Sequence, residues 1–208
     1  MEILVIRHGQ SQADLEDRHE GRADFPLTEL GLRQAHLAAT WIKEHYPPEL
    51  ILSSTLQRAT KTAKIIGEIA GCQVVLEPQL MEWNNGLLAG LLREEAAKRF
   101  PLPPGGRKPH DQFAETESLI EFRARAEMFS SRFKYEYVEP ANYQRIALVS
   151  HGGLINMLFR CFLRLPMTDE IFFSSADTGI HLWEITTERR RLIFVNSQEH
   201  LLALGEGE

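Results

Sequence analysis

The feature that most constrains the fold of this chain is an alternation between short apolar runs and longer segments with helical periodicity. The apolar runs are aliphatic and only a few residues long, so they predict buried β-strands rather than helices. They occupy residues 3–6, 50–52, 73–76 and 145–149. Because helices that connect parallel strands cover both faces of the sheet, the alternation predicts a three-layer α/β/α fold with a mainly parallel central sheet.

The segments between the apolar runs carry the signals of amphipathic helices. Thr28 is a favourable N-cap, Glu29 lies near the positive end of the helix dipole, and Pro47 closes the segment. The apolar residues between them recur at helical spacing. The same spacing predicts three further helices, which carry Leu56, Ala59, Ala63 and Ile66, then Leu119, Phe122, Ala126, Phe129 and Phe133, and then residues 152–165.

Two stretches interrupt the alternation. Residues 12–25 are polar and charged, and predict an ordered surface loop. Residues 83–117 are rich in proline and predict a small, loop-rich excursion around one short helix near residues 91–100, placed to cover a crevice. The tail predicts an antiparallel hairpin at the edge of the sheet, at residues 179–185 and 192–195.

Composition limits the class of protein. The 208 residues suffice for one sizeable core, so we expect a single domain over residues 1–208. A net charge of −6 argues against a nucleic-acid-binding face, and the chain contains no apolar run long enough to span a membrane. Met1 leads directly into the first strand without a signal peptide. Cys72 and Cys161 match no metal or redox spacing, so we expect buried free thiols and a cytoplasmic protein.

Unusual polar residues follow the ends of successive predicted strands. In an open α/β sheet, ligands bind just beyond the carboxyl ends of the strands, so these side chains are expected to converge in one crevice. A local cluster of arginine and histidine attracts an anion even in an acidic protein. The residues are Arg7-His8, then Ser53-Ser54 with Arg58, then Glu82, and then His151.

This set of side chains suits phosphoryl transfer through a phosphohistidine. A neutral imidazole is a good nucleophile toward phosphorus, so His8 is expected to attack in line. Glu82 is expected to protonate the departing alkoxide and later to deprotonate the attacking water. The groups that neutralise the equatorial oxygens are Arg7, Arg58, His151 and the backbone N–H groups of the helix that begins near Gly152.

Each of these residues also fits a structural or surface role that involves no catalysis. Arg58 lies on an amphipathic helix and fits a solvated face, Glu82 fits a surface carboxylate, and His151 fits a helix cap. The recurrence of such residues at strand ends favours function. Six other histidines are scattered and are expected to be surface or structural residues, namely His19, His36, His45, His110, His181 and His200.

A longer series of short motifs contains the same residues and runs through nearly the whole chain. In order they are Arg7-His8-Gly9-Gln10-Ser11, Gly21, Asp24, Pro26-Leu27-Thr28, Gly31, Gln34-Ala35, Ser53-Ser54, Leu56, Arg58-Ala59, Thr62-Ala63, Glu82, Gly86, Gly90, Glu117-Ser118, Ser150-His151-Gly152-Gly153 and Thr178-Gly179. In this combination and order the chain resembles the histidine phosphatase superfamily, the phosphoglycerate-mutase-like proteins.

The resemblance implies that His8 is the nucleophile, that Glu82 is the proton donor, and that no metal or other cofactor takes part. It implies phosphate ligands at Arg7, Arg58 and His151. The remaining candidate substrate-binding residues are Ser11, Asp14 and Gly152.

Two positions depart from the family pattern. The family usually has an asparagine where Asp14 stands, and asparagine is also common where Asp177 stands. An ionised aspartate only accepts hydrogen bonds, so it repels a phosphate dianion unless it is protonated or turned away. The resemblance therefore predicts lower activity or a shifted pH optimum for this chain.

The stretch after Glu82 distinguishes the activities within the family. In the mutases an arginine and a tyrosine hold the substrate carboxylate, whereas Trp83 and Asn85 stand here, and the excursion is short. A small cover excludes water poorly from a phosphohistidine, which favours hydrolysis. Most apolar residues of the excursion are expected to pack within it, and they are also compatible with bulky phosphomonoesters. These residues are Leu87, Leu88, Leu91, Phe100 and Phe113.

The primary hypothesis is therefore a metal-independent phosphatase that acts on a small phosphorylated metabolite. A cofactor-dependent phosphoglycerate mutase and a phosphate-ligand-binding protein with weakened catalysis remain as alternatives. A metal-dependent hydrolase is disfavoured, because the sequence contains no compact cluster of histidine and aspartate ligands. The sequence leaves the physiological substrate and the oligomeric state open.

Overall fold

The computed structural model describes residues 1–167, 171–186 and 188–204. In this part of the chain a six-stranded sheet has the order β3-β2-β4-β1-β5-β6. Strands β3, β2, β4 and β1 are parallel, while β5 runs antiparallel to β1 and β6 antiparallel to β5. The strands are β1 (Glu2–Arg7), β2 (Leu50–Ser53), β3 (Gln73–Leu76), β4 (Arg145–Ser150), β5 (Ile180–Ile185) and β6 (Arg190–Ser197). The predicted parallel sheet with an antiparallel edge hairpin is confirmed.

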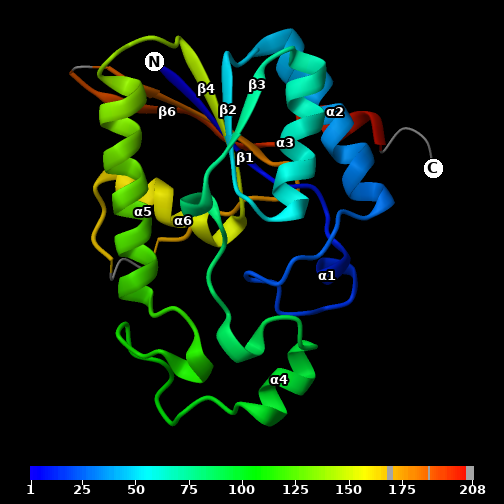
Figure 1. Cartoon of the computed structure of the whole chain (residues 1–208), viewed down its shortest axis with the longest axis vertical. Coiled ribbons are helices and arrows are strands. Elements are labelled where there is room, and N and C mark those ends of the chain that lie inside the picture. The colour runs from blue at the N-terminus through cyan, green and yellow to red at the C-terminus, as the bar shows by residue number, and fades with distance from the viewer. Residues whose placement is uncertain (168–170, 187, 205–208) are drawn as a thin grey trace.

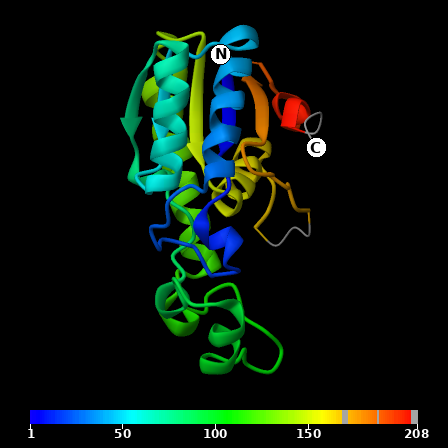
Figure 2. The same cartoon turned by 90° about the vertical axis from the view of Figure 1, so that its right-hand side faces the viewer.

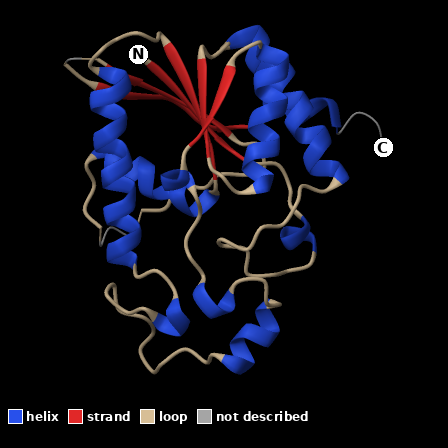
Figure 3. Ribbon diagram, viewed as in Figure 1, coloured by secondary structure: helices blue, strands red, loops and turns tan. Residues whose placement is uncertain are grey.

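Helices cover both faces of this sheet, which confirms the three-layer architecture (Figures 1 and 3). One face packs against α2 (Glu29–His45) and α3 (Gln57–Ala70), and the other against α5 (Leu119–Phe133) and α6 (Gly152–Leu163). The expected Thr28 cap is present, with its side chain accepting from the N–H of Gly31. None of the helices in the described ranges is long and apolar enough to cross a membrane.

Strand β1 lies in the middle of the sheet, between β4 and β5, and divides the core in two. Ile3 and Val5 pack with α5 and α6, whereas Leu4 and Ile6 pack with α2 and α3. Successive residues of a strand point to opposite faces, so four apolar residues in a row are needed where both faces are covered. This burial anchors the residues that follow the strand.

The two irregular stretches contain more helical structure than predicted. Residues 12–25 are not loop throughout, because α1 (Gln12–Leu15) begins there, stabilised by a capping box between Ser11 and Asp14. The short helix expected near residues 91–100 is α4 (Arg93–Arg99). The second stretch also contains helical turns at Gly86–Leu88 and Phe113–Glu115. Outside both stretches, further short helical segments occur at Pro78–Leu80, Lys134–Val138 and Glu199–Leu204.

The segment of residues 83–117 projects beyond the carboxyl ends of the parallel strands (Figures 1 and 2). Its side chains pack partly on one another, since Leu88 is buried, whereas Leu87 is 48 % exposed. The guanidinium of Arg107 lies 5.3 Å from the Trp83 ring centroid and 5.7 Å from that of Phe113. That this segment covers a substrate stays a prediction.

Both cysteines are free thiols, but only one is fully buried. Cys161 lies inside the core on α6, where burial raises its pKa to about 12. Cys72 is only half-buried, which corrects the expectation of two buried thiols. It follows directly on Gly71, which ends α3 in the left-handed conformation, so it lies in a turn at the end of the helix.

Replacing Ile6 with alanine is expected to lower the free energy of unfolding by about 2–5 kcal/mol, because Ile6 is fully buried and its removal leaves a cavity. Urea denaturation of the variant and the parent protein measures the difference. Leu15→Ala is the matched control: Leu15 is 65 % exposed, so its replacement should change stability by less than about 0.5 kcal/mol. Equal effects of the two substitutions would contradict the assigned core.

Candidate active site

Side chains from three neighbouring parallel strands meet beyond their carboxyl ends. His8 follows β1 and His151 follows β4, and their ring centroids are 4.9 Å apart. Ser54 follows β2, and its hydroxyl lies 2.8 Å from Nε2 of His151. Because β1, β4 and β2 are adjacent in the sheet, the structure brings these residues together as the sequence analysis expected. We refer to the space around His8, Arg58 and His151 as the cup.

The imidazole of His8 has a defined tautomer and a free lone pair on one ring nitrogen. Its Nδ1 lies 2.7 Å from the carbonyl oxygen of Gly9, which only accepts, so Nδ1 carries the proton. Nε2 accepts a hydrogen bond from Nε of Arg58 at 3.2 Å, so this nitrogen presents a lone pair. Burial, followed by the charges of Arg58 and Arg7, holds the pKa of His8 well below its usual value. The ring is therefore neutral at pH 7.

The close approach of two glycines positions the backbone after His8. A Cβ on Gly9 would lie 2.5 Å from the carbonyl oxygen of Gly31, at the start of α2. A Cβ on Gly31 would in turn lie 2.1 Å from the carbonyl oxygen of Gln10. Both distances are too short for a side chain, so His8 sits where the chain crosses the first turn of α2 in direct backbone contact.

Arg58, on the first turn of α3, is completely buried beside His8. Its Nη2 donates to the carbonyl oxygen of Gly21 at 2.8 Å, and its Nη1 donates to that of Ala23 at 3.0 Å. Gly21 has a positive φ of 52°. These bonds require the loop between α1 and α2 to fold back over α3, so Arg58 is not a solvated residue of a helix face.

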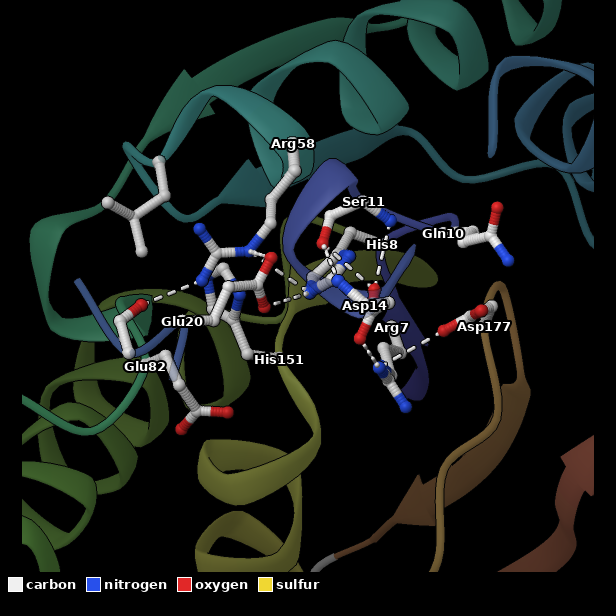
Figure 4. Close-up of polar contacts among 12 residues, drawn as sticks. Arg7, His8, Gln10, Ser11, Asp14, Glu20, Arg58, Glu82, His151 and Asp177 are labelled. Atoms are coloured by element: carbon white, nitrogen blue, oxygen red, sulfur yellow. Dashed lines mark hydrogen bonds and ion pairs between the residues drawn. The ribbon is translucent and has the colours of Figure 1, made fainter. Parts of the chain in front are cut away.

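Arg7 is held by a different set of partners. Its Nη1 donates to the carbonyl oxygen of Ser175 at 2.9 Å. Its Nη2 lies 3.4 Å from Oδ1 of Asp14 and 3.1 Å from Oδ1 of Asp177 (Figure 4). Asp14 also accepts from the backbone N–H and the hydroxyl of Ser11, each at 2.9 Å. The structure therefore places Ser11 and Asp14 in the cap of α1, with Asp14 turned toward Arg7.

The carboxylate of Glu82 lies at the N-terminus of α6. Oε1 accepts from the backbone N–H of Trp83 at 2.7 Å, and Oε2 accepts from that of Gly153 at 2.8 Å. A Cβ on Gly153 would lie 2.5 Å from Oε1, so only glycine leaves room for the carboxylate there. Gly152 packs beside the Arg7 side chain. The helix start expected near Gly152 thus lies between Glu82 and Arg7.

Two charged residues that were not predicted from the sequence, Glu20 and Arg125, surround these groups. Oε2 of Glu20 lies 3.8 Å from Nε2 of His8, and its Oε1 lies 3.2 Å from Nε of Arg58. Burial raises the pKa of Glu20. Arg125, on α5, donates to the carbonyl oxygens of Met81 and Glu82 at 2.6 and 3.0 Å, and so fixes the backbone that carries Glu82. The only sequence feature that pointed to Glu20 as a site residue was its position before Gly21. No sequence feature pointed to Arg125.

Two buried histidines support the segment beside Arg7. His181 lies 2.8 Å from the Ser175 hydroxyl through Nε2, and its Nδ1 accepts from the backbone N–H of Asn196. Nε2 of His200 lies 2.9 Å from the Thr178 hydroxyl. Burial lowers the pKa of both histidines to about 4. The expected structural role of these two residues agrees with their position.

Comparison with known proteins places these features in a family context. A sequence model of the histidine phosphatase superfamily (branch 1) matches residues 3–198. "Probable phosphoglycerate mutase GpmB" of Photorhabdus laumondii is 34 % identical over 174 residues, which covers 80 % of this chain and 76 % of that protein. Among the described residues, no group of three or more histidine, cysteine, aspartate or glutamate side chains has an arrangement that could hold a metal ion.

Solved structures show the same similarity in three dimensions. A mycobacterial glucosyl-3-phosphoglycerate phosphatase, solved in complex with VO3, is 28 % identical with a TM-score of 0.81, covering 95 % of this chain and 99 % of that one. The alpha-ribazole phosphatase from Shigella flexneri is 24 % identical with a TM-score of 0.81, covering 95 % of this chain and 96 % of that one, and shares the fold. The structural neighbours thus cover nearly the whole chain, and the sequence relative covers four-fifths of it.

The low pKa values of His181 and His200 predict a loss of stability in acid. The unfolded chain takes up protons below the usual histidine pKa of 6.5, whereas the folded chain keeps both rings neutral down to about pH 4. The free energy of unfolding therefore falls as the pH decreases between these limits, by about 1.4 kcal/mol per pH unit for each histidine.

Urea denaturation of His181→Gln at pH 7 and pH 5 measures this contribution. The variant should lose less stability between the two pH values than the parent protein, because it lacks one of the histidines that stay neutral in the folded chain. His36→Gln is the matched control, since His36 is exposed and its replacement should leave the pH dependence unchanged. An unchanged pH dependence in His181→Gln would contradict the assignment of His181 as neutral and buried.

Proposed function

The chain belongs to the histidine phosphatase superfamily (branch 1), and we propose that it is a metal-independent phosphatase that hydrolyses small phosphomonoesters through a phosphohistidine on His8. The observation that supports this most directly is the state of the His8 ring. Its Nε2 lone pair lies in a buried cup beside Arg58 and His151, and its Nδ1 donates to a backbone carbonyl. Such a nitrogen attacks phosphorus without first losing a proton.

In the first half of the proposed reaction, Nε2 of His8 forms a bond to phosphorus while the bond from phosphorus to the ester oxygen breaks. The proton of Glu82 passes to the departing alkoxide. The imidazole becomes a cation when it is phosphorylated, and the hydrogen bond from Nδ1 to the Gly9 carbonyl stabilises that charge. Arg58 and Arg7 neutralise the charge on the equatorial oxygens, and the uncharged His151 ring contributes an N–H hydrogen bond to them.

In the second half, the ionised Glu82 takes a proton from water, whose oxygen attacks the phosphorus. The bond between Nε2 of His8 and phosphorus breaks, which releases inorganic phosphate and restores the neutral imidazole. Arg125 acts here as a positioning residue, because its contacts fix the backbone of Met81 and Glu82 rather than reaching the substrate.

A phosphoglycerate mutase is the second candidate, and the identity of 34 % to "Probable phosphoglycerate mutase GpmB" favours it. A mutase must return the phosphoryl group to an alcohol before water reaches it. Incubation with 3-phosphoglycerate separates the two activities: hydrolysis releases inorganic phosphate, whereas a mutase forms 2-phosphoglycerate faster than phosphate. We expect phosphate release.

His8→Ala is expected to reduce the hydrolysis of p-nitrophenyl phosphate by about 10³-fold or more, because the nucleophile is lost. The parent protein, quenched during turnover, should carry an acid-labile phosphoryl group that His8→Ala lacks. His110→Ala is the matched control, since the His110 side chain is 69 % exposed. Hydrolysis at the parent rate in His8→Ala would rule out the proposed mechanism.

Replacing Glu82 with glutamine should affect poor leaving groups most. An alkoxide needs a proton to depart, whereas p-nitrophenolate departs without one, so kcat for an alkyl phosphate should fall by about 10²-fold or more in Glu82→Gln and kcat for p-nitrophenyl phosphate by far less. Steady-state kinetics with both substrates measure the two effects. Equal losses would contradict the role of Glu82 as the proton donor, and the same pattern in Glu20→Gln alone would transfer that role to Glu20.

A further inference from the structure

The turn of residues 175–179, which we call the Arg7 turn, holds the Arg7 side chain from one side. The carbonyl oxygen of Ser175 accepts from Nη1 of Arg7 at 2.9 Å, and Oδ1 of Asp177 lies 3.1 Å from Nη2 (Figure 4). A longer contact, of 3.4 Å, joins Nη2 to Asp14. The direction in which the guanidinium points therefore depends on the position of this turn.

One residue of the Arg7 turn has a strained backbone. Thr178 is β-branched and has a φ of 52°, in the left-handed region that such residues rarely adopt. In this conformation its backbone N–H donates to the carbonyl oxygen of His8 at 3.1 Å. Its hydroxyl donates to the carbonyl oxygen of Asp177 at 2.7 Å and lies 2.9 Å from Nε2 of His200. Strain of this kind persists only where the surrounding structure enforces it, and it is concentrated at functional sites.

Asn196, on the edge strand β6, connects the Arg7 turn to the sheet. Its Oδ1 accepts from the backbone N–H of Ala176 at 2.8 Å. A Cβ on Gly179 would lie 2.3 Å from the same oxygen, so only glycine leaves room for it there. Asn196 itself has a φ of 54°, a left-handed conformation that asparagine tolerates better than most residues. The Asn196 side chain is thus fitted against both ends of the turn.

His181 secures the same turn from strand β5. Its Nδ1 accepts from the backbone N–H of Asn196 at 3.0 Å, and its Nε2 lies 2.8 Å from the hydroxyl of Ser175. The register of the β5–β6 pair shifts at this point, because two residues of β6 lie between the partners of Ile180 and Leu182. Such bulges change the direction of a side chain near functional sites. Here the bulge is where Asn196 leaves the regular strand and bonds to the Arg7 turn.

We propose that Asn196 is a positioning residue for phosphate binding, and that it acts by holding the Arg7 turn, which holds the Arg7 guanidinium. The Asn196 side chain bonds to one residue of the turn and Arg7 contacts two others, so the turn carries the effect between them. A guanidinium that is ordered before the ligand arrives loses less freedom on binding, which strengthens the affinity. This inference deepens the proposed function and rests on it, because it takes Arg7 as a phosphate ligand.

The test measures the Kd of inorganic phosphate at pH 7 by isothermal titration calorimetry. Asn196→Gly removes the acceptor Oδ1 and keeps a residue that adopts a positive φ without strain. It should raise Kd by about fivefold, the effect of losing one neutral hydrogen bond. Asn196→Asp retains an acceptor oxygen and should bind phosphate within about twofold of the parent protein. Val195→Ala is the matched control on the same strand, since Val195 is 42 % exposed, and it should leave Kd unchanged.

A double-mutant cycle with Arg7→Ala decides whether the effect passes through Arg7. In the Arg7→Ala background, Asn196→Gly should change Kd by less than about twofold, because the group that the turn positions is already gone. A purely structural role of Asn196 would instead lower the fraction of folded protein. Such a loss reduces the measured stoichiometry and leaves the Kd of the folded molecules unchanged.

An unchanged Kd in Asn196→Gly would overturn the inference, as would an equal rise in Asn196→Asp or Val195→Ala. It would also fail if Asn196→Gly raised Kd as much in the Arg7→Ala background as in the parent protein, or if the parent protein did not bind phosphate. In each of these cases, hydrolysis of p-nitrophenyl phosphate that depends on His8 would leave the proposed function intact. Loss of the proposed function would instead appear as hydrolysis of p-nitrophenyl phosphate that persists in His8→Ala.

Discussion

The hydrogen bond from Arg58 to His8 is the interaction on which the rest of the site depends. It places a guanidinium that is fully excluded from solvent against an uncharged ring. Burying such a cation costs several kcal/mol unless every donor finds a partner. The carbonyls of Gly21 and Ala23 and the carboxylate of Glu20 supply those partners. The polar loop after α1 thus compensates Arg58, and it brings the Glu20 carboxylate to 3.8 Å from Nε2 of His8.

The same electrostatics determine the protonation state of the site. Burial of the rings, and then the charges of Arg58 and Arg7, disfavour a proton on His8 and on His151. In the proposed reaction a phosphate dianion would reverse this balance, because it would compensate the arginines and stabilise the imidazolium formed on phosphorylation of His8. The backbone carbonyl of Gly9 is already in place for that charge. The geometry of the cup is thus already close to what the proposed phosphorylated state requires.

Much of this arrangement followed from local sequence patterns, and the remainder depended on contacts that no local pattern encodes. The strands, the Thr28 cap and the convergence of His8, Arg58 and His151 were predictable, because apolar periodicity and strand order determine them. Helix α1 was missed because four residues are too short to show a period. Glu20 was missed because its position depends on the left-handed turn at Gly21 and on the burial of Arg58. The orientation of Asp14 was likewise set by its bonds to Ser11 and Arg7, which are specific to the folded chain.

The backbone contact between Gly9 and Gly31 has a consequence for how this scaffold diversifies. His8 follows directly on a strand in the centre of the sheet, and the backbone next to it contacts the first turn of α2 with no side chain between them. The position of His8 relative to the sheet is therefore fixed by the main chain and does not depend on the rotamers of nearby side chains. A change of substrate specificity in such a fold must therefore come from the surrounding loops, since the backbone fixes the position of His8.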